Sequence, residues 1–188
     1  MAPFMPGRLA AVAALLVLLL PPAAPARAQA HLAPSWMKID APAKHVSLDV
    51  VAGFNANNGA LNYNGYFTGD MTVVVPVGWT VDVHFKNNDA MLPHSLVLTK
   101  PYAKDHFPDR AGVDDVAIPR AYTDNPDQGI PSPKTDTVEF AARDPGPYYF
   151  FCGAPGHGQG GMWTHFIVDA AAGAPYVTIA PGAEPGRP

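Results

Sequence analysis

The chain has 188 residues, of which 48% are hydrophobic, and its formal net charge is −4 at pH 7. This length suits one domain with tails, the hydrophobic content excludes a chain that is disordered throughout, and the acidic balance argues against nucleic acid as a partner. Proline and glycine number 22 and 17, so the composition favours short strands joined by turns over long helices.

The first segment, residues 1–28, has the pattern of a secretory signal peptide. Arg8 precedes an apolar run of twelve residues, 9–20, and small residues then lead to Ala26 and Ala28, which form an A-x-A cleavage pattern. We expect cleavage and export to the periplasm or the extracellular face of the membrane, because an apolar segment that spans a bilayer needs about 18 or more residues. Retention of the segment as a membrane anchor is the open alternative.

Strand patterns follow an N-terminal extension at 29–43 and mark a folded domain at 44–169. Val81, Val83 and Phe85 face one way while the residues between them face the other, as in a half-buried strand. A Pro-Val-Gly turn joins the second and third of the predicted strands. Strands are predicted at 46–51, 71–75, 79–88, 96–99, 137–141, 148–152 and 163–168. Several short strands at this spacing predict an all-β fold, a Greek-key β-sandwich or barrel.

Two segments lack these patterns. Residues 101–133 contain six prolines and many aspartates, so we expect a long surface excursion with a short helical turn near 112–116. The tail at 170–188 is rich in Ala, Pro and Gly, and we expect it to be mobile, with an edge strand at 176–179.

Cys152 is the one cysteine of the sequence, and it opens a Gly-rich loop that also contains His157 and Met162. A free thiol in an exported chain must be buried, metal-bound or reactive, and metal binding explains it best. Copper that alternates between two oxidation states suits two histidines and one cysteine in a plane with a weak, long axial methionine. The loop therefore offers three of the four ligands of a copper site. The opposing interpretation is a Gly-rich turn that contains these three residues by chance.

His94 is the best candidate for the fourth ligand. It follows a turn-rich link and opens the apolar strand predicted at 96–99, so a rigid sheet end can aim its imidazole. The alternative is a surface histidine at the start of a strand.

The other histidines have weaker signals. His84 and His165 lie inside strands and are expected to face solvent, and nothing marks His45 or His106 as ligands. His31 would become the N-terminal residue if cleavage followed residue 30, and its amine and imidazole could then chelate copper. Cleavage after residue 28 fits the pattern equally well.

Parts of the chain from 62 to 168 resemble sulfocyanin, a blue copper protein of the cupredoxin superfamily that is related to rusticyanin. The most specific part is Cys152-x₄-His157-x₄-Met162, with Pro155 and Gly156 before the histidine and Trp163 after the methionine. The other similar parts are residues 62–66, 71–87, the pair His94 and Ser95, and 148–151.

The resemblance implies a cupredoxin-like copper-binding domain with one copper ion. His94, Cys152 and His157 would be the equatorial ligands and Met162 the axial one. The implied function is a one-electron carrier, not an enzyme, that exchanges electrons with protein partners such as cytochromes or a terminal oxidase or reductase. A monomer is expected, and peripheral association with the membrane is compatible with this role. Sulfocyanins are often tethered by an N-terminal segment, whereas this N-terminus has a cleavable pattern, and residues 101–133 do not map onto the family.

The surroundings of the ligands support a closed, dry site. Ser95 is expected to donate a hydrogen bond to the Cys152 sulfur or to fix the loop, and aromatic residues at 148–151 and Trp163 should exclude water. Small residues around His157 predict that its ring edge reaches the surface. The other function classes are a copper delivery or storage protein and a copper-dependent oxidoreductase domain. These would need an open coordination position or a second metal cluster, and a binuclear copper centre would need a second cysteine in the loop.

Overall fold

The computed structural model describes Met1, residues 30–103 and residues 106–184. The signal peptide predicted at 1–28 lies, from residue 2 onward, outside the described residues. Within the described ranges the helices are two 3-10 turns, Asn57–Ala60 (η1) and Val113–Asp115 (η2). No helix of these ranges is long and apolar enough to cross a membrane. The helical turn predicted near 112–116 is confirmed by η2.

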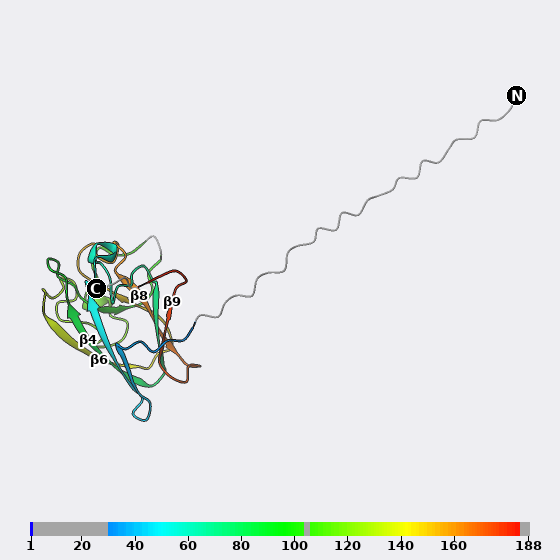
Figure 1. Ribbon diagram of the computed structural model, residues 1–188, viewed down its shortest axis with the longest axis horizontal. Helices are drawn as coiled ribbons and strands as arrows, with labels where there is room; N and C mark the ends of the chain where they lie inside the picture. The colour runs from blue at the N-terminus through cyan, green and yellow to red at the C-terminus, as the bar shows by residue number, and fades with distance from the viewer. Residues whose placement is uncertain (2–29, 104–105, 185–188) are drawn as a thin grey trace.

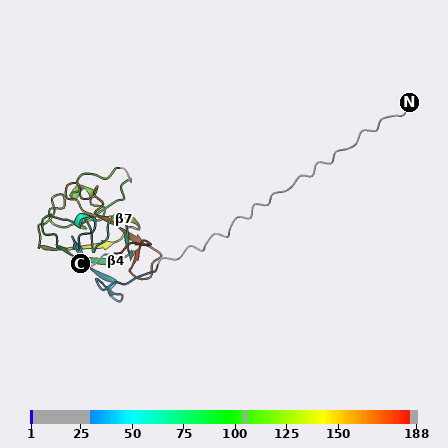
Figure 2. The same cartoon turned by 45° about the horizontal axis from the view of Figure 1, so that its top comes forward.

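The strands form two mixed sheets, which confirms the predicted all-β class. The strands are β1 (Met37–Asp40), β2 (His45–Ala52), β3 (Met71–Pro76), β4 (Trp79–Asn87), β5 (Val97–Thr99), β6 (Thr135–Ala142), β7 (Gly146–Phe151), β8 (Trp163–Asp169) and β9 (Tyr176–Ile179). One sheet has the order β1-β2-β4-β6 and the other β5-β7-β8-β3-β9. In Figure 1, β4 and β6 lie together in the first layer and β8 and β9 in the second. Figure 2 shows β7 and β4 one above the other, as members of the two layers.

The core lies between the inner faces of the two sheets. β2 alternates between half-buried and buried side chains along its whole length, and Val46, Leu48 and Val50 point inward. Burial of such an aliphatic side chain contributes about 1.5–3 kcal/mol. In β2, the alternation of apolar and polar residues in the sequence is therefore the alternation of side chains that face the core and side chains that face solvent. β1 escaped prediction because only Met37 of its four residues is buried.

The turn between β3 and β4 links the two layers. β3 pairs with β8 and β9, whereas β4 pairs with β2 and β6. Gly78 has a φ of +85°, a left-handed conformation that a residue without Cβ adopts at low cost. The two strands predicted around this turn thus belong to different sheets and do not pair with each other.

The expected surface excursion at 101–133 is corrected by the structure. Its segments form bridges with the start and edge of β5, for example Val97 with Tyr122, and Ala111, Ala121 and Ile130 are buried. The free edge of β5 needs hydrogen-bond partners, and this segment supplies them. The edge strand predicted at 176–179 is confirmed, since β9 pairs with β3.

Candidate metal centre

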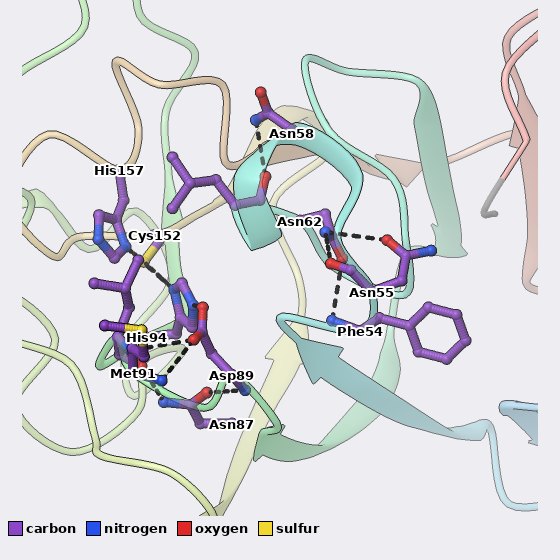
Figure 3. A network of polar contacts seen from close by, with 12 residues as sticks. Phe54, Asn55, Asn58, Asn62, Asn87, Asp89, Met91, His94, Cys152 and His157 are labelled. Carbon is purple, nitrogen blue, oxygen red and sulfur yellow. Dashed lines mark hydrogen bonds and ion pairs between the residues drawn. The ribbon is translucent and has the colours of Figure 1, made fainter. Parts of the chain in front are cut away.

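Three predicted ligands come together at one end of the sandwich. His94 lies just before β5, Cys152 directly follows β7, and His157 lies in the loop between β7 and β8. The Cys152 Sγ atom lies 3.4 Å from His157 Nδ1 and 4.0 Å from His94 Nδ1, and the two Nδ1 atoms are 3.1 Å apart. Figure 3 shows both rings beside the sulfur.

This donor set fits a copper ion. The separations leave room for an ion at about 2 Å from each donor, the usual length of a bond from a transition metal to imidazole or thiolate. Two imidazoles and one thiolate, with a methionine nearby in the chain, are the soft set of an electron-transfer copper site. Among the described residues, these three form the group of His, Cys, Asp or Glu side chains close enough to hold a metal.

Met162 closes the loop at its base. The Cys152 N–H donates to the Met162 carbonyl at 3.0 Å, and the Met162 N–H donates to the His157 carbonyl at 2.9 Å. The Met162 side chain is fully buried. These bonds bring the methionine back beside the cysteine that begins the loop.

Burial sets the protonation of the donors. It lowers the pKa of the His157 imidazole to about 4, an effect that His94 enhances. Burial also lowers the pKa of His94, against the opposing effect of Asp89, and it raises the pKa of the Cys152 thiol. Near neutral pH the two imidazoles are therefore unprotonated at one nitrogen and ready to bind, and the thiol must release its proton when a metal binds.

Ser95 fixes the loop, one of the two roles expected of it. Its backbone N–H points to the Cys152 sulfur at 3.4 Å. Its hydroxyl donates to the Pro126 carbonyl at 2.6 Å and accepts from the Gly153 N–H at 3.0 Å. The hydroxyl oxygen is 3.8 Å from the sulfur, so the backbone amide is the better donor to the sulfur. Pro126 belongs to the segment that composition had assigned to the surface.

An aromatic cluster packs against the ligand loop at Gly158. A Cβ at Gly158 would lie 1.8 Å from the Phe151 ring, so the two residues are in close contact and only glycine fits. Phe107 stacks on Phe151 and on Trp163. Sequence reasoning missed this stacking because Phe107 lies among prolines and aspartates. Gly158 is buried, and His157 is half-buried.

His165 corrects an expectation. It was predicted to face solvent, but its ring makes edge contacts with Tyr149 and Trp163, and it is half-buried. Burial lowers its pKa. This strand face is partly covered because the rings of Trp163, on the same strand, and Tyr149, on the neighbouring strand β7, pack against His165.

The remaining histidines lie outside the cluster. His84 is exposed, as predicted, and its Nδ1 is 3.1 Å from Asp49. His45 lies 2.9 Å from Asp82, and His31 stacks on Tyr176.

Asp89 is a part of the site that sequence reasoning missed. Its carboxylate is 8% exposed, and Oδ2 lies 2.9 Å from Nε2 of His94, on the side of the ring opposite the sulfur (Figure 3). Its other oxygen accepts hydrogen bonds from the N–H groups of Met91 and Leu92. Burial alone would raise the pKa of Asp89, but these amides and His94 outweigh it and lower the pKa. The available signal was an aspartate in an Asn-Asn-Asp turn five residues before the histidine.

The two sheets and the His–Cys–His cluster at their end define a cupredoxin, the class of the blue copper proteins, with a site for one copper ion. The sulfocyanin (SoxE) domain family matches residues 34–179. Sulfocyanin of Sulfolobus acidocaldarius is 32% identical over 142 residues, which are 72% of this chain and 69% of that protein. The chain belongs to the sulfocyanin family, as the sequence motif predicted.

Similar solved structures include an auracyanin and a rusticyanin. Reduced auracyanin of Roseiflexus castenholzii has a TM-score of 0.47 and 24% identity, over 65% of this chain and 96% of that chain. Rusticyanin of Thiobacillus ferrooxidans has a TM-score of 0.45 and 23% identity, over 71% of this chain and 86% of that chain.

Proposed function

We propose that this protein is a mobile one-electron carrier. The observation that supports this most is the closure of the donor set: Cys152 and His94 have no exposed surface, so a bound ion would offer no position to a substrate. Bound copper would supply the exchange of a single electron between its two oxidation states.

The chain supplies four residues with different roles. When copper is bound, His94, Cys152 and His157 would hold it through two Nδ1 atoms and one Sγ atom, and Met162 would supply a weak thioether ligand. The Ser95 amide reduces the charge density on the sulfur. The burial of His94 and Cys152 and a thioether ligand would both favour the reduced state of bound copper, so we expect a high reduction potential.

His157 is the route for the electron. The His157 side chain is half-buried, and Pro155, which lies two residues before it in the same loop, is exposed. The edge of the His157 ring can therefore approach a partner. The partners are redox proteins, such as cytochromes or a terminal oxidase or reductase, and brief contact suits a small interface. We place the protein outside the cytoplasmic membrane, a proposal that rests on the signal peptide pattern at 1–28. We expect it to work as a monomer. Peripheral contact with the membrane is compatible with this role.

The optical spectrum of the copper-loaded protein tests this function. A short copper–thiolate bond gives an intense visible charge-transfer band. We expect this band in the native protein and its loss in Cys152→Ser, with the far-UV circular dichroism of both unchanged. A native protein that binds copper without the band would favour the second candidate, a copper delivery or storage protein. An intense band that persists in Cys152→Ser would refute the assignment of the thiolate.

A further inference from the structure

A buried carboxylate holds the one histidine of the centre that has no contact with solvent. The His94 side chain has 0% exposure, and its two ring nitrogens point in opposite directions: Nδ1 toward Cys152 and His157, Nε2 toward Asp89. The ring has no exposed surface, so bulk solvent does not satisfy either nitrogen. The partner of Nε2 therefore decides which nitrogen bears the proton.

Asp89 is held in place by its own surroundings. Its Oδ1 accepts from two backbone amides, those of Met91 at 2.8 Å and Leu92 at 3.1 Å, and its own N–H donates to Asn87 Oδ1 at 2.9 Å. Asn87 in turn donates its amide hydrogens to the carbonyls of Leu92 and Ile130. The backbone of Gly53 lies so close that a Cβ there would be 2.8 Å from the Asp89 Cβ. The carboxylate thus has one oxygen left for the histidine and little freedom to move.

We propose that Asp89 is a positioning residue that fixes His94 as the Nε2–H tautomer and so keeps Nδ1 free for the metal. An ionised carboxylate only accepts hydrogen bonds, so Nε2 must donate and the lone pair remains on Nδ1. The site is thereby set for an ion before one binds. This inference extends the proposed copper function to the metal-free protein.

Histidine ¹⁵N chemical shifts of the metal-free native protein test the proposal directly. Long-range ¹H–¹⁵N correlation distinguishes the two tautomers, and we expect His94 to be Nε2–H. A His94 ring protonated at Nδ1 would overturn the proposal. The measurement uses no copper, so it stands apart from the optical test of the proposed function.

Two substitutions test the consequence for metal binding. Asp89→Leu removes both acceptor oxygens, and Asp89→Asn leaves one oxygen and puts an NH₂ group on the other side. If that oxygen stays with the Met91 and Leu92 amides, the NH₂ group forces Nε2 to accept and shifts the proton to Nδ1. In Asp89→Leu we expect the Nε2–H signal of His94 to weaken. In the same variant the Cu(II) affinity, measured against a competing chelator, should fall about 10- to 100-fold.

Asp82→Asn is the matched control. Asp82 also pairs with a histidine, His45, at 2.9 Å. It lies near the start of β4, however, whereas Asp89 and His94 follow the end of that strand. We expect this variant to keep the native His94 tautomer and the native copper affinity. The proposal fails if Asp89→Leu keeps both as well, or if Asp82→Asn weakens copper binding as much as Asp89→Leu does.

Discussion

At the scale of single residues, two donors of the metal centre are oriented by neighbours that are not themselves ligands. The Ser95 amide points to the Cys152 sulfur, and the Asp89 carboxylate holds His94. Met162 is held through the hydrogen bonds of its backbone and the burial of its side chain. Its thioether should therefore adjust the properties of the ion more than hold it.

Met162→Gln tests this weak role. An amide oxygen is a harder ligand than a thioether and stabilises Cu(II), so the reduction potential should fall. We expect a decrease of about 60 mV or more, which corresponds to a tenfold change in the relative affinity for Cu(II) and Cu(I). Voltammetry measures the potential, and metal analysis should find a full complement of copper. Complete loss of copper would mean that Met162 is a principal ligand.

His165 should make stability depend on pH. Burial between Tyr149 and Trp163 lowers its pKa below that of an unfolded histidine, about 6.5. Below that pH the unfolded chain binds a proton that the native state resists, so the free energy of unfolding falls as the pH falls; above it the effect vanishes.

His165→Gln should flatten this dependence. Urea unfolding of the metal-free protein between pH 7 and pH 5 should show a shallower slope in the variant. The difference should stay well below about 1.4 kcal/mol per pH unit, the value for one whole proton, because the ring is partly exposed. Equal slopes in both proteins would show that His165 titrates alike in the native and unfolded states.

Sequence patterns predicted the donor residues better than the groups that orient them. Cys152, His157 and Met162 share one short loop, and their spacing alone indicates copper. Asp89 acts across a turn, and an aspartate after two asparagines is equally typical of an ordinary turn. Its function depends on burial, which composition does not show.

At the scale of elements, η1 holds the ligand loop from outside. The Asn58 side chain donates to the Gly160 carbonyl at 2.8 Å and to the Leu61 carbonyl at 3.0 Å. A Cβ at Gly160 would lie 2.7 Å from the Leu61 side chain, so the turn and the loop are in close contact. This turn is 102 residues from the loop in sequence.

Asn58→Gly should weaken this contact without straining the turn. Asn58 has a φ of +51°, a conformation that glycine adopts freely, so the substitution removes the amide and keeps the backbone. We expect a loss of about 1 kcal/mol of stability and faster hydrogen exchange in the loop at 156–162. Asn58→Asp, which keeps the size but has no N–H to donate, should have a similar effect. Native exchange rates in both variants would contradict this role.

Four of the strands, β2, β4, β6 and β8, were predictable because they alternate between buried and more exposed residues, and β3, β5 and β7 were predictable as short apolar runs. The strand at 37–40 and the buried parts of 101–133 were not, for a common physical reason. Both depend on a neighbouring strand that offers free backbone groups: β2 for the first, and β5 for the second. Single buried residues such as Ala111 and Ala121 have no periodicity by which a pattern could find them.

At the scale of the whole molecule, the exposed surface near His157 is the proposed meeting point with a partner. Pro155→Glu places a charge there and should slow electron exchange severalfold, while the visible spectrum stays unchanged. Val77→Glu is the control, because Val77 lies in the exposed turn at the opposite end of β4. Stopped-flow mixing with a redox partner measures both rates. Equal rates in the two variants would place the electron route elsewhere.

Gly158 is unsuitable for this test, because any side chain at that position would collide with the ring of Phe151.

The close approach of Gly129 to His94 limits how this centre could be moved to another protein. Gly129 has a φ of +81°, and a Cβ there would lie 2.8 Å from the His94 backbone nitrogen. The Ile130 N–H donates to the His94 carbonyl at 2.8 Å, and Pro126 holds the hydroxyl of Ser95. A graft of the loop at 152–162 onto a foreign sandwich would transfer three ligands but none of these supports. A working transplant has to include the stretch at 89–95, which contains Asp89 and His94, and the stretch at 126–130 as well, so the smallest portable unit of this site is discontinuous in sequence.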